Sequence, residues 1–180
     1  MTEIYYAYFQ SPLGRLLMLS QQGKLIRLDF EREQLALHPN WRYKPNDVLF
    51  LQVSEALDNY FSGKIEHFCK IPLAPQGTAF QLSVWQALRE LEYGQWRSYA
   101  DLAIKVNHPK AVRAVGGAVG RNPISIIIPC HRILAKDAAL TGFGGGLPAK
   151  RYLLQLEGIS YKERGIEFVR PKQSNLYHHL

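Results

Sequence analysis

The pattern of apolar residues changes at residues 70–77, a segment with two prolines and a glycine that predicts a linker. Before it, the chain has short β-rich runs separated by turn residues; after it, the apolar residues follow mainly helical spacing. We therefore predict an α+β fold. A small amino-terminal sheet domain with one helix covers residues 1–76, a mainly helical domain covers residues 77–158, and a carboxy-terminal tail covers residues 159–180.

The first part predicts three strands followed by a helix. Turn residues lie between the strands, and Gly63 ends the helix. The expected strands cover residues 4–10, 15–20 and 24–30, and the expected helix covers about 48–61.

In the second part, we expect helices over residues 78–93, 98–106, 109–120 and 148–157. The second and third of these are short and are separated by a turn at Asn107-His108, which predicts a helix-turn-helix. The apolar run Ser125–Ile128 predicts a buried strand, and it leads directly to Cys130.

The net charge of +7 belongs to the second part. Residues 1–76 hold eight Lys/Arg and eight Asp/Glu, whereas residues 77–180 hold 14 and 7. Between Arg97 and Lys136 the one acidic residue is Asp101. Such a stretch suits a polyanion such as nucleic acid, and a basic face that only keeps the protein soluble explains the charge equally well.

The composition, 47% hydrophobic and 21% charged, is that of a globular chain. No apolar run reaches the roughly 18 residues of a membrane helix, and the first residues lack the pattern of a secretory signal. With two cysteines there is no disulfide framework, so we expect a cytoplasmic location. The histidines lack metal-ligand spacing with the cysteines, so no metal site is expected.

Cys130 is the candidate nucleophile. Pro129 predicts a bend before it, polar His131 and Arg132 follow it, and positive surroundings lower the pKa of a thiol. His131 can serve Cys130 only if the chain turns between them, because neighbouring strand residues point to opposite faces. The local sequence also allows a purely structural Cys-His pair, and Cys69 is interpreted as core filler.

Two further features are unusual. Glu157 ends a helix, where the helix dipole disfavours a carboxylate, so it needs a partner such as His131; on spacing alone, a solvated glutamate is the favoured explanation.

The helix after Pro109 contains Gly116 and Gly117, which cost roughly 1 kcal/mol each relative to alanine. They indicate close approach to a flat partner or tight packing against the core.

The run Asn122 to Arg132, with the sequence NPISIIIPCHR, resembles the active-site signature of the methylated-DNA–protein-cysteine methyltransferases. The resemblance continues through Thr78–Gln81, Trp85, Ser98-Tyr99, Lys110–Gly117, Gly142–Gly146 and Glu157-Gly158. The resemblance covers about half of the chain, residues 77–158. Within the family, the chain resembles the single-polypeptide bacterial type without a regulatory domain.

The resemblance implies stoichiometric repair of DNA, in which Cys130 takes the alkyl group from O6-alkylguanine and no cofactor is needed. His131, acting through a water, would accept the thiol proton while Glu157 orients the imidazole. Tyr99 would donate a hydrogen bond to the departing guanine and, as a DNA-binding residue, help to rotate the nucleotide. Asn122 would brace the turn that holds Cys130.

For the DNA, the resemblance implies that Arg113 fills the gap left by the flipped base and that Ala111, Ala114 and Gly116 lie against the minor groove. From their charge, Lys110 and Arg121 are candidate phosphate contacts. The expected partner is double-stranded DNA bound by a monomer, and O4-alkylthymine is left open as a second substrate.

One departure is Phe143, where some family members have a tyrosine, which puts a hydroxyl contact in the pocket in doubt. Two other classes stay open. A cysteine hydrolase would share the Cys-His pair but would turn over, and it has no reason for a basic helix-turn-helix. A non-catalytic protein that binds damaged DNA would share the DNA surface but lack a usable nucleophile.

Overall fold

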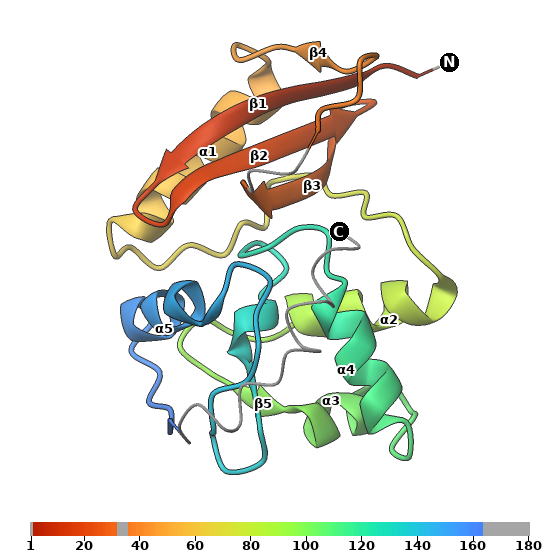
Figure 1. Cartoon of the computed structure of the whole chain (residues 1–180), viewed down its shortest axis with the longest axis vertical. Helices are drawn as coiled ribbons and strands as arrows, with labels where there is room; N and C mark the ends of the chain where they lie inside the picture. Colours follow the sequence, from red (N-terminus) through yellow and green to blue (C-terminus); the bar gives the residue numbers. More distant parts are fainter. Residues whose placement is uncertain (1, 32–35, 164–180) are drawn as a thin grey trace. The chain divides into compact units, whose positions relative to one another are not determined.

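The computed structural model describes residues 2–31 and 36–163. The chain forms two compact units, residues 1–76 and residues 77–180 (Figure 1). No helix among the described residues has the length and apolar character needed to cross a bilayer.

The first unit is a four-stranded sheet with one helix (Figure 1). The strand order is β3-β2-β1-β4; β1, β2 and β3 form an antiparallel meander, and β4 pairs parallel with β1. The predicted strands and helix are confirmed, and the two-residue β4 is an addition. The elements are β1 (Ile4–Ser11), β2 (Gly14–Gln21), β3 (Lys24–Phe30), β4 (Arg42–Tyr43) and α1 (Val48–Phe61).

Both faces of this sheet are covered, because the consecutive residues Leu16, Leu17, Met18 and Leu19 are all buried and point alternately to the two faces. On one face Leu17 and Leu19 pack with residues that include Trp41 and Ala74. The helix α1 buries Val53, Leu57 and other apolar residues of one helical stripe. Asp47 caps its first turn through a 3.0 Å hydrogen bond from the Leu49 amide.

The second unit is mainly helical (Figure 1). Thr78 with Gln81, and Ser98 with Asp101, form capping boxes that begin the first two helices. The elements are α2 (Ala79–Arg89), β5 (Arg97–Ser98), α3 (Tyr99–Lys105), α4 (Val112–Gly120), the 3-10 helix η1 (Cys130–Arg132), β6 (Ile133–Leu134) and α5 (Leu147–Leu156).

The helices α3 and α4 follow each other across the predicted turn, at which Asn107 has a φ of 64°. Both pack on α2 and on each other. The Trp85 indole on α2 donates a 2.8 Å hydrogen bond to the carbonyl of Ala118 on α4. The helix-turn-helix is therefore held on α2 by a buried polar contact as well as by apolar packing.

Three sequence expectations are wrong in detail. The helix expected from Pro109 begins at Val112, and the helix expected to reach Tyr93 ends at Arg89. The strand expected over 125–128 is absent: the segment turns tightly, with Ile126 at a φ of 72° and a 2.8 Å bond from the Ile127 amide to the Ser125 carbonyl. An apolar run predicts burial correctly, but burial alone does not distinguish a strand from buried turns.

The start of the expected tail packs on the helical unit. Ile159 is buried against Leu134 and Leu154, and Lys162 pairs with Ala139 in an isolated bridge. The remainder of that expectation, residues 164–180, lies outside the described residues.

Candidate active site

Asn122 shapes the buried turn that precedes Cys130. Its side-chain amide donates to the carbonyl of Ile128 at 2.7 Å, and its side-chain oxygen accepts from the amide of Ile124 at 3.0 Å. One buried side chain thus satisfies two backbone groups that a strand would have paired with a neighbouring strand. Cys130 then begins η1, and its side chain comes close enough to Asn122 to receive a hydrogen bond.

His131 and Arg132, which follow Cys130 in η1, form a buried cluster with Glu157. The His131 Nε2 and Glu157 Oε2 atoms lie 2.5 Å apart, and the Arg132 Nε donates to Glu157 Oε1 at 2.8 Å. His131 is fully buried and Glu157 is 6% exposed. Glu157 is the C-cap of α5, and Oε1 also accepts the amide of Gly94 at 3.1 Å. The solvated helix end favoured by spacing alone is therefore wrong for Glu157.

The charges in this cluster fix which nitrogen of His131 carries its hydrogen. Burial raises the pKa of Glu157, but the hydrogen bonds and charges of His131 and Arg132 outweigh burial and lower it to about 2. Burial lowers the pKa of His131, and the contact with Glu157 offsets only part of that change. A neutral imidazole beside an ionised carboxylate places its hydrogen on Nε2. The Nδ1 atom is then a proton acceptor, and it is buried with no hydrogen-bond partner among the residues that the structure describes.

The Cys130 thiol is 8% exposed, and burial raises its pKa above the ordinary value. The hydrogen bond from Asn122 and the charge of Lys150 act in the opposite direction but do not overcome burial. The expectation that cationic surroundings give this thiol a lowered pKa is therefore wrong, because desolvation of the thiolate dominates. Such a thiol reacts only when a neighbouring base takes its proton.

Lys150 and Thr141 were missed from the sequence. Lys150 is 1% exposed, and its ammonium donates to the Ile133 carbonyl at 2.7 Å and to Thr141 Oγ1 at 3.0 Å. Burial lowers the pKa of Lys150 to about 7. A signal for it was available, because Lys150 shares helical spacing with the apolar Leu153 and Leu154 and with Glu157.

Thr141 in turn contacts Tyr99, whose hydroxyl lies 2.9 Å from Thr141 Oγ1. Burial raises the pKa of Tyr99, so its phenol stays protonated at neutral pH. Phe143, in the same loop as Thr141, is 4% exposed. The loop that contains Phe143 thus contributes a hydroxyl at position 141, although position 143 has none.

The expected DNA contacts lie along the helix-turn-helix. Arg113, Ala114, Lys110 and Arg121 are exposed, whereas Ala111 and Gly116 are half-buried. A Cβ atom added at Gly116 would lie 3.7 Å from the Tyr99 ring, which is ordinary contact. Tight packing within the unit therefore does not require a glycine at this position, and close approach of a partner becomes the better explanation.

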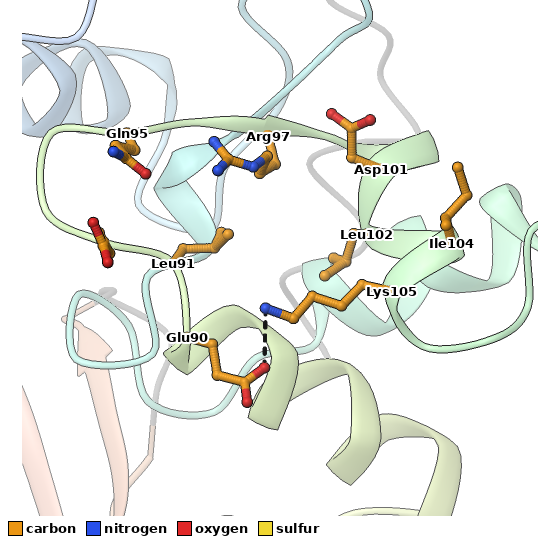
Figure 2. Close-up of a pocket in the computed structure, with 9 residues that line it drawn as sticks. Glu90, Leu91, Gln95, Arg97, Asp101, Leu102, Ile104 and Lys105 are labelled. Atoms are coloured by element: carbon orange, nitrogen blue, oxygen red, sulfur yellow. Dashed lines mark ion pairs between the residues drawn. The ribbon is translucent and has the colours of Figure 1, made fainter.

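A separate hollow of about 400 Å³ lies between the end of α2, β5 and α3 (Figure 2). Acidic and basic side chains face one another in it, and the Lys105 ammonium pairs with Glu90 at 3.0 Å (Figure 2). None of the predicted site residues lines this hollow. The candidate active site is therefore the cluster around Cys130.

Comparison with known proteins decides the family. The pattern of the 6-O-methylguanine DNA methyltransferase DNA binding domain matches residues 79–159, and that of the ribonuclease-like domain of the same proteins matches residues 4–75. The chain is a methylated-DNA–protein-cysteine methyltransferase by family. The family resemblance and the α+β fold expected from the sequence are thereby confirmed.

Several members of this family are similar to the chain over most of its length. The methylated-DNA–protein-cysteine methyltransferase of Haemophilus influenzae is 56% identical over 178 residues, 99% of both chains. The constitutive enzyme of Bacillus subtilis is 40% identical and covers 89% of this chain and 99% of its own.

Solved structures of related proteins support the same family assignment. An O6-methylguanine methyltransferase of Mycobacterium tuberculosis is 38% identical, with a TM-score of 0.76 over 86% of this chain and 92% of its own. OGT of the same organism in complex with DNA has a TM-score of 0.77, with 38% identity over 85% of this chain and 92% of its own. As a methylated-DNA–protein-cysteine methyltransferase, the protein has DNA as its partner and repairs it by direct alkyl transfer.

Proposed function

We propose that Cys130 accepts the alkyl group and that O6-alkylguanine in double-stranded DNA is the donor. One observation carries this proposal: a buried thiol is followed in the chain by a histidine whose Nδ1 can accept a proton and whose Nε2 is held by Glu157 at 2.5 Å. Cys69, the other free cysteine, is exposed, so its interpretation as core filler is wrong, and it is not followed by a histidine.

In the reaction, the thiol proton passes through a water to Nδ1 of His131. The sulfur then forms a bond to the alkyl carbon, the bond from that carbon to O6 breaks, and its electron pair stays on guanine. Tyr99 donates a hydrogen bond to the departing base. In the overall balance, guanine gains the one proton that the thiol loses. Glu157 is a positioning residue here, because it fixes the tautomer of His131 and stabilises the imidazolium that forms.

The burial of Cys130 explains why a base is needed, and the product formed on its sulfur explains why repair is stoichiometric. A thiol with a raised pKa is mostly protonated at neutral pH, so transfer requires proton removal within the site. The thioether that results has no acidic proton and cannot act again as a nucleophile. The added methyl group also enlarges a packed site, which typically costs about 1–3 kcal/mol.

On the DNA side, we propose that Arg113 enters the base stack while Ala111, Ala114 and Gly116 lie along the minor groove. The exposed Lys110 and Arg121 are the proposed phosphate contacts. Contacts to phosphates carry no sequence information, which suits a protein that must act on damage in any sequence. Action as a monomer, a cytoplasmic location and repair of O4-alkylthymine stay predictions.

The test is intact-protein mass after incubation with duplex DNA that contains one O6-methylguanine. We expect one methyl group per protein, mapped to the peptide that contains Cys130, and no further turnover. Cys130→Ala should abolish the adduct while DNA is still bound, and the matched variant Cys69→Ala should react like the unaltered protein. An adduct on Cys69, or repeated turnover without an adduct as in a cysteine hydrolase, would overturn the proposal.

A further inference from the structure

Thr141 joins two groups of the site that belong to different elements. The Lys150 ammonium, on α5, donates to Thr141 Oγ1 at 3.0 Å. The Tyr99 hydroxyl, at the first residue of α3, lies 2.9 Å from the same oxygen. Lys150 is held in place by its 2.7 Å bond to the Ile133 carbonyl, next to η1 in the chain. A short polar chain therefore runs from a buried ammonium to the phenol proposed to face the departing base.

The direction of the hydrogen bonds in this chain follows from the chemistry of its members. While Lys150 is protonated it can only donate, so Thr141 Oγ1 accepts from it in that state. The threonine hydroxyl has one hydrogen, and the Tyr99 oxygen is the acceptor found for it among the described residues. The threonine then donates to the tyrosine oxygen, which leaves the phenolic hydrogen free to point elsewhere.

We propose that Thr141 is a positioning residue for alkyl transfer, which turns the Tyr99 O–H toward the departing guanine. This inference rests on the proposed function, because it gives Thr141 a part in the same transfer to Cys130. Without the threonine hydroxyl, the phenol would lose the donor that engages its oxygen, and its hydrogen would no longer have a fixed direction. A donor already aimed at the charge that develops on the leaving base is worth more than one that must reorient.

The test compares two reactions of the same thiol. Transfer from O6-methylguanine in DNA needs help for the leaving base, whereas alkylation of Cys130 by iodoacetamide releases iodide, which needs no proton. We expect Thr141→Val, which removes the hydroxyl and keeps the shape, to slow transfer from DNA about tenfold, the equivalent of one lost hydrogen bond. The iodoacetamide rate should not change. Thr141→Ser, which keeps the hydroxyl, should restore most of the transfer rate.

A double-mutant cycle with Tyr99→Phe separates this role from a general structural one. If Thr141 acts through Tyr99, adding Thr141→Val to Tyr99→Phe should cause no further loss. The inference fails if Thr141→Val slows both reactions alike, if it slows neither, or if its effect persists in the Tyr99→Phe background. Failure of the proposed function itself would look different, because the unaltered protein would then gain no methyl group on Cys130.

Discussion

The two units of the protein bury different kinds of side chain. Among the described residues, the sheet unit buries one charged side chain, Asp29, which pairs with the partly exposed Arg27 at 2.8 Å. The helical unit buries His131, Arg132 and Glu157 in one cluster of contacts, and it also buries Lys150, which donates to the Ile133 carbonyl. The sheet unit thus follows the rule that charges stay near water, and the helical unit breaks it.

This difference shows that the helical unit contains buried charged groups that lower the stability of the fold. A buried charge that loses its partner is strongly destabilising, and even a paired one often contributes less than apolar packing would. Such groups persist in natural proteins mainly at functional sites. Here the cost provides a histidine with a fixed tautomer, a carboxylate that stays ionised and a lysine near the thiol whose pKa is lowered to about 7.

The largest expected effect follows from removing the carboxylate at the centre of the cluster. Glu157→Gln keeps the shape but leaves the Arg132 charge without its counter-charge, so the free energy of unfolding should fall by about 3 kcal/mol. The transfer rate should fall about 100-fold, the typical contribution of an oriented general base. DNA affinity should stay close to that of the unaltered protein. Single-turnover transfer assays, urea unfolding and a binding titration measure the three quantities.

Asp29→Asn is the matched control in the sheet unit. It also removes a buried carboxylate with an arginine partner, but the Arg27 side chain is 27% exposed, so we expect a loss of only about 1 kcal/mol and an unchanged transfer rate. Equal effects of the two variants on transfer would mean that the cluster around Cys130 has no special part in the chemistry.

Acid should destabilise the fold through the same carboxylate. The folded-state pKa of Glu157, about 2, lies below the ordinary value of 4.5. Its carboxylate therefore stabilises the fold above about pH 4.5, and this stabilisation is lost as the pH falls through 2. The amount at neutral pH is about 3 kcal/mol. Urea unfolding between pH 2 and pH 5 should show a steeper loss for the unaltered protein than for Glu157→Gln; parallel curves would contradict the assignment.

The contrast between the units also explains what the sequence could predict. The strands and α1 follow from local periodicity and turn residues, because each is decided by neighbours within a few positions. The turn before Cys130 depends on the side chain of Asn122, which bonds to the carbonyl of Ile128, six residues later. This bond replaces a backbone hydrogen bond that a strand would have made. The role proposed for Thr141 depends on side chains of α3 and α5 meeting at its hydroxyl. Tyr99 lies 42 residues before Thr141 in the chain, and periodicity does not contain such a contact. Local pattern predicts elements, whereas the site is made by polar contacts of individual side chains, which the periodicity of apolar residues does not contain.

Basic residues of the two units should differ in their contribution to the salt dependence of DNA binding. Lys110→Ala and Arg121→Ala should each reduce the slope of log affinity against log salt by about 1, because each removes one proposed phosphate contact. Lys64→Ala, which removes an exposed lysine of the sheet unit, is the control and should leave the slope unchanged. Equal slopes for all three variants would mean that the basic stretch of the helical unit serves solubility and not DNA binding.

The smallest effect concerns Gly116, where stability and binding should change in opposite directions. Among the described residues, the added methyl group of an alanine there would lie 3.7 Å from the Tyr99 ring, an ordinary contact distance, and the alanine gains helix propensity within α4. Gly116→Ala should therefore raise the free energy of unfolding by up to about 1 kcal/mol. If the glycine is present so that DNA can approach the helix, the same methyl group should weaken DNA binding and slow transfer. Had the glycine been required for packing, the variant would lose stability instead, and binding would fall only as the fold does. Urea unfolding and a DNA titration on this one variant distinguish the two explanations, because only the first predicts a more stable protein that binds DNA less tightly.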